Sequence, residues 1–253
     1  MTDSANPHIP VEVCVESVAG AYAAVVGGAE RIELCSSLSE GGLTPSAGLC
    51  EAVCAAVKVP VVAMVRPRAG DFLYDGTEVD VMARDIQALR NAGAAGIVTG
   101  ALTSDGDVDR RRMQEFVDLA EDLPVTFHRA FDVCRDADEA VETLCALGVS
   151  RLLSSGQRPA APEGKQVLRA AVERAGDRLT VIAGAGIHED NVVRLVEFTG
   201  VREVHMSAAG LRKSRMAFRR EEVYMGDPDK DEYLLYTTEE AAVARVVSAL
   251  RNR

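Results

Sequence analysis

Eight short apolar runs recur at regular intervals along this chain, and they restrict its fold more than any other feature. They are Val11–Val15, Arg31–Ser36, Pro60–Arg68, Gly96–Leu102, Pro124–Phe131, Arg151–Gly156, Leu179–Ile187 and Glu203–Ala208. Seven stretches with helical periodicity, such as Glu78–Asn91 and Asp138–Leu147, separate the runs, and an eighth, at about Glu239–Leu250, follows the last one. Strands that alternate with helices pair in parallel through right-handed crossovers. Eight such units predict a closed (β/α)8 TIM barrel of the α/β class.

One domain over residues 1–253 is expected, because single barrels of this class commonly run to about 250 residues. Residues 1–10 are expected to form a polar N-terminal tail. Residues 210–236 are expected to form a long loop between the last strand and the last helix. A loop of that length in a compact domain usually serves function or an oligomer contact.

Local signals place several helix ends. Thr44 precedes a proline and is expected to cap the second helix. A capping box of Thr237 and Glu240 is expected to start the last helix. Gly93 and Gly148 follow two helical stretches, where a left-handed residue commonly ends a helix.

The overall charge restricts the partners. The formal net charge is −11, which argues against a nucleic acid but leaves small anions open. The polar start is unlike a secretory signal, and no apolar run is long enough to cross a bilayer. Six cysteines in such a chain are expected to be reduced thiols, so we expect a cytoplasmic protein without a membrane partner.

The active site of a TIM barrel lies at the carboxyl ends of its strands, and polar residues gather there in this sequence. Strand alternation turns every second side chain inward. The side chains expected inside the mouth are Glu12, Cys14, Glu33, Cys35, Arg66, Arg68, His128, His205 and Ser207. A buried ion-pair network without chemistry is the structural alternative for Glu12, Glu33 and Arg66.

Cys14 and Cys35 differ from the other four cysteines, which are expected to pack in the core. They follow the matching phrases Val-Glu-Val and Ile-Glu-Leu on adjacent strands. Neighbouring strands lie roughly 4.8 Å apart, so two inward thiolates could reach one soft ion. Thiolate sulfur suits Cu(I), whereas zinc needs four ligands, or three and water.

A second pattern predicts anion binding. Gly184 and Gly186 lie near the end of the seventh run and Ser207 near the end of the eighth, where barrel enzymes often hold a phosphate. Arg66, Arg68 and Arg129 are expected to add positive charge nearby. Glycine-rich turns also follow strands for steric reasons alone.

An enzyme is therefore the alternative to a copper protein. Glu33 and His128 would be its acid–base candidates, with Arg66 holding an anionic substrate. No lysine falls at a strand's carboxyl end, which disfavours a Schiff-base aldolase, and no motif indicates an organic cofactor.

Several phrases together resemble the CutC family of copper homeostasis proteins, in order and over essentially the whole chain. The matching segments are Glu33–Cys35, Glu40–Ser46, Arg66–Phe72, Thr126–Asp132, Ser154–Gly156, Ala183–Ile187 and Glu203–Ala208. Two departures are small: Ala69 replaces a more usual glycine, and Ser154 replaces a threonine.

The resemblance implies a cytosolic single-domain barrel that is dimeric or higher, with a proposed Cu(I) role. Cys14 and Cys35 match the family's candidate cysteines. Asp71 and Ser155 lie within matching motifs and join the ligand-binding candidates, as does His205. Two hypotheses follow: Cu(I) binding through the two cysteines in copper homeostasis, or an isomerase, lyase or hydrolase for a small phosphorylated or carboxylated metabolite.

Overall fold

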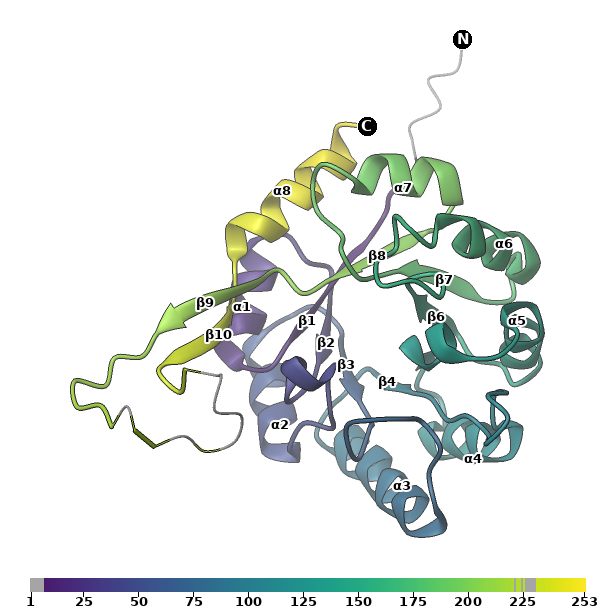
Figure 1. Cartoon of the computed structure of the whole chain (residues 1–253), viewed down its shortest axis with the longest axis horizontal. Helices are drawn as coiled ribbons and strands as arrows, with labels where there is room; N and C mark the ends of the chain where they lie inside the picture. Colours follow the sequence, from purple (N-terminus) through teal and green to yellow (C-terminus); the bar gives the residue numbers. More distant parts are fainter. Residues whose placement is uncertain (1–6, 221, 224, 226–230) are drawn as a thin grey trace.

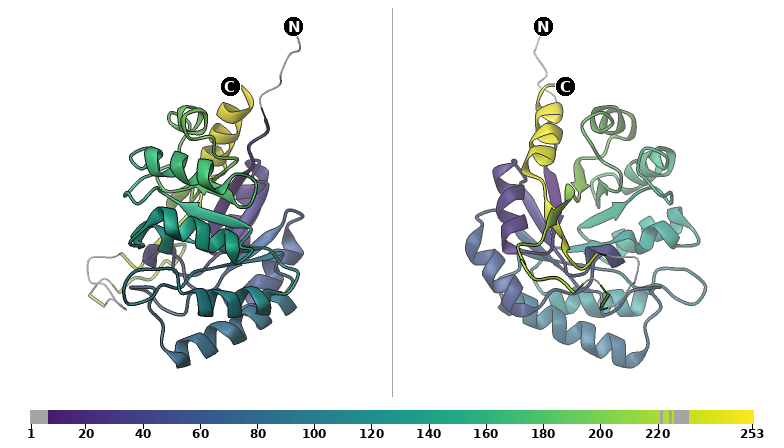
Figure 2. Two further views of the ribbon diagram at one scale, coloured as in Figure 1. Left: turned by 90° about the vertical axis from the view of Figure 1, so that its right-hand side faces the viewer. Right: turned by 60° about the vertical axis from the view of Figure 1, so that its left-hand side comes forward.

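Eight parallel strands close into a barrel in sequence order, β1 to β8, as predicted (Figure 1). The computed structural model describes residues 7–220, 222, 223, 225 and 231–253. In chain order the elements are β1 Val11–Val15, α1 Val18–Val26, β2 Arg31–Leu34, η1 Leu38–Glu40, α2 Ala47–Ala56, β3 Val61–Met64, α3 Gly76–Asn91, β4 Gly96–Thr99, α4 Arg110–Ala120, β5 Val125–Phe127, η2 Arg129–Val133, α5 Ala137–Ala146, β6 Arg151–Ser154, α6 Lys165–Ala175, β7 Thr180–Ala183, α7 Val192–Thr199, β8 Glu203–Met206, β9 Ala209–Lys213, β10 Leu234–Thr238 and α8 Glu240–Arg251. The helices surround the strands in every view (Figure 2).

The strands are buried on both faces, because helices cover the outside and side chains fill the inside. On β1, Val13 and Val15 pack in the apolar layer beneath the helices. Their neighbours Glu12 and Cys14 are buried outside that layer. The alternation inferred from the sequence therefore holds on this strand.

Two predicted helix starts were wrong. Ser46, not Thr44, caps α2 by accepting from the amide of Leu49. The hydroxyl of Thr44 is instead hydrogen-bonded to the backbone of Arg66 on both its donor and acceptor sides. Thr237 cannot cap α8, because it is paired with Gly210 in a strand.

The predicted ends of α3 and α5 are confirmed. Gly93 and Gly148 follow them with φ of +94° and +71°. In addition, α3 begins with a capping box, in which Asp75 and Glu78 accept from each other's amides. Such reciprocal bonds satisfy two amides that a helix start leaves without partners.

Residues 210–236 were predicted to form a long loop, but the two ends of this segment pair as antiparallel strands, β9 and β10. We call this pair of strands the arm. Their register joins Leu234 to Lys213 and Thr238 to Ala209. The arm projects from the barrel beside α1 (Figure 1). Its strands are short and lie far apart in sequence, so the sequence alone did not show them as a pair.

The predicted tail is described only from residue 7 onward. Ile9 is buried, and the carbonyl of Pro10 accepts from the amide of Val204 on β8. The last residues of this segment are therefore tied to the barrel. Among the described residues, no helix is both long and apolar enough to cross a membrane.

Candidate functional site

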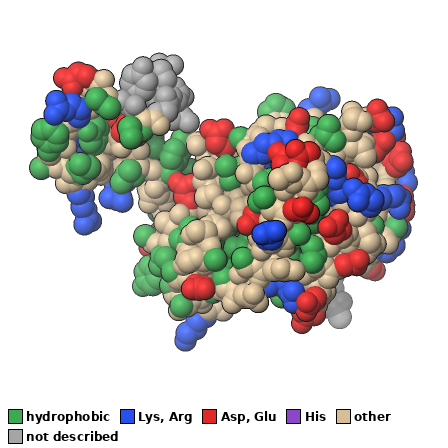
Figure 3. Space-filling view, turned by 90° about the horizontal axis from the view of Figure 1, so that it is seen from below, with side chains coloured by type: hydrophobic (Ala, Val, Ile, Leu, Met, Phe, Trp, Pro, Cys, Tyr) green, Lys and Arg blue, Asp and Glu red, His purple; other side chains and the backbone are tan. Residues whose placement is uncertain are grey.

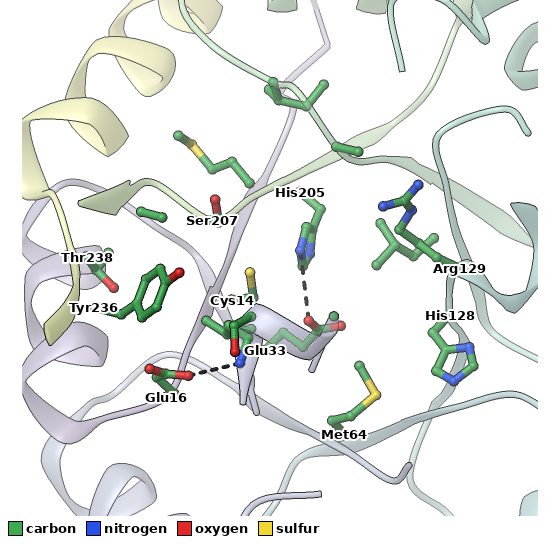
Figure 4. Close-up of a pocket in the computed structure, with 18 of the residues that line it drawn as sticks. Cys14, Glu16, Glu33, Met64, His128, Arg129, His205, Ser207, Tyr236 and Thr238 are labelled. Atoms are coloured by element: carbon green, nitrogen blue, oxygen red, sulfur yellow. Dashed lines mark hydrogen bonds and ion pairs between the residues drawn. The ribbon is translucent and has the colours of Figure 1, made fainter. Parts of the chain in front are cut away.

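A cavity of about 470 Å3 opens at the carboxyl ends of the strands (Figure 4). Strands from around the barrel contribute to it, and so does the arm. Its lining includes Cys14, Glu16, Glu33, Met64, Arg66, Phe72, His128, Arg129, Leu153, Gly186, His205, Ser207, Tyr236 and Thr238. The polar mouth predicted from the sequence is thus a cavity lined by both polar and apolar side chains.

Three potential metal ligands meet at this cavity. Cys14, Glu33 and His205 are all buried, and their ligand atoms lie within 4.8 Å of one another. They come from the three adjacent strands β1, β2 and β8, with Cys14 directly opposite Glu33 in the strand register. The predicted second thiol, Cys35, is not a member of this group of three.

Cys35 lies beside the same carboxylate. Its Sγ is 3.5 Å from Glu33 Oε2. The residue is fully buried and packs with the interior side chains of Val62, Met64 and Val98. Both predicted copper ligands therefore adjoin Glu33, although the structure groups Cys14 with His205 rather than with Cys35.

A network of buried ion pairs lies next to the site and contacts it through His205. Glu12 Oε1 lies 2.7 Å from His205 Nδ1, and Glu12 Oε2 accepts from Arg31. Arg31 also donates to Glu203, which in turn pairs with Arg151 at 3.2 Å. These contacts match the ion-pair network that the sequence offered as a structural alternative. Glu12 belongs to it, and Glu33 joins it through an ion pair with His205 at 3.8 Å, whereas Arg66 does not take part in these contacts.

The network sets the charges of the site. Burial alone would raise the pKa of Glu12, but hydrogen bonding and attraction to His205, together with Arg31, lower it to about 2. Burial would lower the pKa of His205, yet Glu33 and Cys14 raise it well above its ordinary value. Glu12 is therefore a carboxylate at neutral pH, and the acidic groups beside His205 favour its protonated form.

Glu33, which lines the cavity, and Cys35, which does not, both resist ionisation. Burial raises the pKa of Glu33, and the attraction of His205 opposes that effect only in part. Burial, reinforced by Glu33, raises the pKa of the Cys35 thiol well above its usual range. A cation arriving here would therefore displace protons from its ligands.

Arg66 lines the cavity, but its guanidinium is held by the backbone. Its Nη1 donates to the carbonyls of Glu40 and Gly42, and its Nη2 to that of Gly70. The guanidinium also lies over the ring of Phe72, 5.0 Å from its centre. These bonds connect the loop that follows β2 to the loop that follows β3. Arg66, which was predicted to bind an anion, therefore has a structural role.

Arg68 and Asp71 are not among the cavity-lining residues. Arg68 forms ion pairs with Glu78 and, at 3.1 Å, with Asp71. It also donates to the carbonyl of Leu73 at 2.9 Å. Both predicted ligand-binding residues thus organise the loop before α3.

His128 lines the cavity in a neutral form. Burial and the nearby guanidinium of Arg66 lower its pKa from 6.5 to about 3. Its Nδ1 accepts from the amide of Ala130 at 3.2 Å, so Nε2 carries the proton. Nε2 is buried and has no hydrogen-bond partner among the described residues.

Arg129 and Ser155 meet at Asp132, a residue whose role the sequence analysis missed. Asp132 accepts from Arg129 Nε at 2.7 Å and from the hydroxyls of Ser154 and Ser155. Arg129 Nη2 donates to Ser155 Oγ at 2.9 Å. Arg129 reaches the cavity, whereas Ser155 is not in its lining. The aspartate could have been suspected, because it ends the Thr126–Asp132 motif.

The remaining predicted ligand-binding residues also include some that line the cavity and one that does not. Gly186 and Ser207 line the cavity, and Gly184 does not. Gly186 has a φ of +69°, and a side chain on Gly184 would stand 2.6 Å from Leu153. Steric demands are therefore sufficient to explain both glycines.

Glu16 and the arm residues Tyr236 and Thr238 also line the cavity and were not predicted. Alternation continued past Cys14 would have turned Glu16 to the same side. It accepts from the amide of Leu38 at 3.0 Å. Nothing in the sequence places the arm residues, because their position depends on the pairing of β9 with β10.

Comparisons of the sequence with known proteins agree on one protein family. The sequence model of the CutC family matches residues 9–210. A "family protein CutC" of Vibrio campbellii is 45% identical over 242 residues, covering 95% of this chain and 98% of that protein. The human "copper homeostasis protein cutC homolog" is 44% identical over 243 residues, covering 96% of this chain and 89% of the human protein.

A solved structure agrees as well. The putative copper homeostasis protein CutC of Streptococcus agalactiae superimposes with a TM-score of 0.76 and 30% sequence identity. The superposition covers 79% of this chain and 99% of the streptococcal chain.

Proposed function

The chain belongs to the CutC family, and we propose that it serves copper homeostasis by binding one Cu(I) ion through Cys14 and Cys35. The observation that carries this proposal is the position of both thiols at one buried carboxylate. Cys14 lies opposite Glu33 in the register, and Cys35 Sγ is 3.5 Å from Glu33 Oε2. The name of the human relative supports the same function.

The surroundings favour a soft cation. Thiolates are the ligands that Cu(I) prefers, and two of them suffice. The bound ion would replace the protons of both thiols, and burial raises the pKa of the Cys35 thiol, so binding should release protons and weaken in acid. All six cysteines are free thiols. This supports a reducing compartment, the cytoplasm, in which Cu(I) is the expected oxidation state.

An anaerobic Cu(I) titration against a calibrated chelator tests the proposal. The wild type should bind one ion, and Cys14→Ser and Cys35→Ser should each lose most of that affinity. Cys145→Ser is the control, because Cys145 lies on the outer helix α5, away from the cavity. Equal binding by all four proteins would contradict the proposal.

The size of the cavity favours a second candidate, the enzyme acting on a small anionic metabolite. About 470 Å3 is far more than one ion needs and falls within the usual range of small-molecule sites. Glu33 Oε1 and His128 Nε2 are buried without hydrogen-bond partners among the described residues, so a ligand could use both. The names of the relatives favour copper.

A metabolite library screened by thermal shift tests this candidate. Arg129→Gln is the informative variant, because Arg129 reaches the cavity and its side chain is 45% exposed. A stabilising anion whose effect disappears in Arg129→Gln would support the enzyme. No stabilisation of the wild type by any anion would contradict it.

We also propose that the protein is a homodimer or a higher homo-oligomer. Exposed apolar side chains gather on the arm and the residues that follow β9, on the lobe at the upper left of Figure 3. They include Leu211, Met216, Phe218, Leu235 and Tyr236. Light scattering should give a multiple of the 27.0 kDa chain, and a monomer would contradict the proposal.

A further inference from the structure

We propose that Cys14, Glu33 and His205 form a second kind of metal site, for a divalent transition ion such as Zn²⁺. The three side chains converge at the cavity (Figure 4), with their ligand atoms within 4.8 Å of one another. This site shares Cys14 with the proposed copper site but does not use Cys35. The divalent site depends on Glu33 and His205, which copper binding does not require.

Glu33 offers an uncommitted oxygen, and His205 Nε2 lies in an ion pair with the other oxygen of the same carboxylate. Glu33 Oε1 is buried and accepts no hydrogen bond from any described residue. His205 Nε2 lies 3.8 Å from Glu33 Oε2, which is beyond hydrogen-bonding distance. Once Nε2 gives up its proton, it offers a lone pair toward the same point as Glu33. A buried carboxylate oxygen without a donor is costly, and a cation would satisfy it.

The other nitrogen of His205 is already fixed, as metal-binding histidines require. Nδ1 lies 2.7 Å from Glu12 Oε1, and Glu12 is itself held by Arg31. A carboxylate that receives one ring N–H fixes the tautomer and aims the opposite nitrogen at the metal. The supporting shell of a metal site is therefore built before any ion arrives.

The donor set indicates the class of metal. One thiolate, one imidazole and one carboxylate are all ligands of zinc, whereas a carboxylate contributes little to Cu(I). Around a tetrahedral zinc ion such atoms lie about 3.5 Å apart, so they need to approach by roughly 1 Å from the 4.8 Å limit. The thiolate and carboxylate would balance the charge of a dication.

The fourth coordination position would face the cavity, because all three ligands belong to its lining. Structural zinc sites are closed by four protein ligands, whereas three ligands and an open position are typical of sites that bind water or substrate. The proposed site therefore belongs to the open class, with water or a small oxygen ligand as the fourth partner.

Anaerobic titration with Co²⁺, a spectroscopic substitute for Zn²⁺, tests the site through its absorption spectrum. The wild type should bind one ion with a sulfur-to-cobalt charge-transfer band and visible bands of four-coordinate geometry. Cys14→Ser should abolish the charge-transfer band, and Glu33→Gln should weaken binding at least about tenfold. Both substitutions keep the size of the side chain, and circular dichroism checks that the variants fold.

Cys35→Ser is the matched control and should keep the cobalt spectrum of the wild type. The same four proteins titrated with Cu(I) separate the two proposals, because copper should be lost in Cys35→Ser and kept in Glu33→Gln. A wild type that binds no Co²⁺, a charge-transfer band that survives in Cys14→Ser, or full affinity in Glu33→Gln would each overturn the divalent site. None of these outcomes depends on whether copper binds.

Discussion

His205 Nδ1 lies 2.7 Å from Glu12 Oε1, at the floor of the barrel mouth. This contact connects two parts of the molecule with different tasks. On one side, Glu12 belongs to a buried ion network with Arg31 and Glu203 that closes the barrel between β8 and β2. On the other side, the imidazole shares the cavity with Cys14 and Glu33. The same histidine therefore links the stability of the barrel to the chemistry of its mouth.

Glu12→Leu should lower the free energy of unfolding by about 3 kcal/mol, measured by urea denaturation. Arg31 and His205 would lose a buried carboxylate, and an unpaired buried charge is strongly destabilising. Glu173→Gln is the control, because it removes an exposed ion pair with Arg169 and should change stability very little. Equal effects of the two substitutions would show that the network contributes nothing.

Arg66→Met should destabilise the protein by about 2 kcal/mol or more. Arg66 donates hydrogen bonds to the carbonyls of Glu40, Gly42 and Gly70, and charged donors contribute more than neutral ones. The stability change should be the same with and without added phosphate, because both Nη atoms of the guanidinium donate to backbone carbonyls. A large stabilisation by phosphate in the wild type that vanishes in Arg66→Met would instead restore the anion-binding role.

Acid should destabilise the protein partly through His128. Its folded pKa of about 3 lies below the ordinary value of 6.5, so the unfolded chain takes up a proton that the folded chain refuses. The stability contribution of this group is therefore complete above pH 6.5 and decreases as the pH falls toward 3. The slope is about 1.4 kcal/mol per pH unit between these values.

His128→Asn isolates this effect, because the asparagine oxygen can still accept from the amide of Ala130. Urea denaturation of both proteins between pH 7 and about pH 5 gives the comparison. The variant should lose less stability than the wild type over this range. Parallel curves would show that the histidine is protonated in the folded protein.

The sequence predicted the barrel because periodicity depends only on neighbouring residues. Alternation also turned Cys14, Glu33 and His205 toward the interior correctly. It could not tell which inward residues meet, because that depends on the stagger between strands. The stagger places Cys14 opposite Glu33, so Cys14 and Cys35 do not lie directly opposite each other although they hold matching positions in the two phrases.

The roles of the arginines could not be predicted from the sequence either, because they also depend on contacts between segments that are distant in the chain. Arg66 has the charge of an anion ligand, but the loops folding over it supply carbonyl acceptors that no motif reveals. The arm was missed because β9 and β10 are short and are joined by a long intervening segment. Tyr236 and Thr238 reach the cavity only through that pairing.

X-ray absorption at the copper edge tests the central claim most directly, because it counts the sulfur atoms bound to the ion. The protein loaded anaerobically with one equivalent of Cu(I) should show two sulfur neighbours, and Cys35→Ser and Cys14→Ser should each show at most one. Cys145→Ser should match the wild type. Copper surrounded only by nitrogen and oxygen in the wild type, or an unchanged sulfur count in Cys14→Ser, would contradict copper binding by these two cysteines.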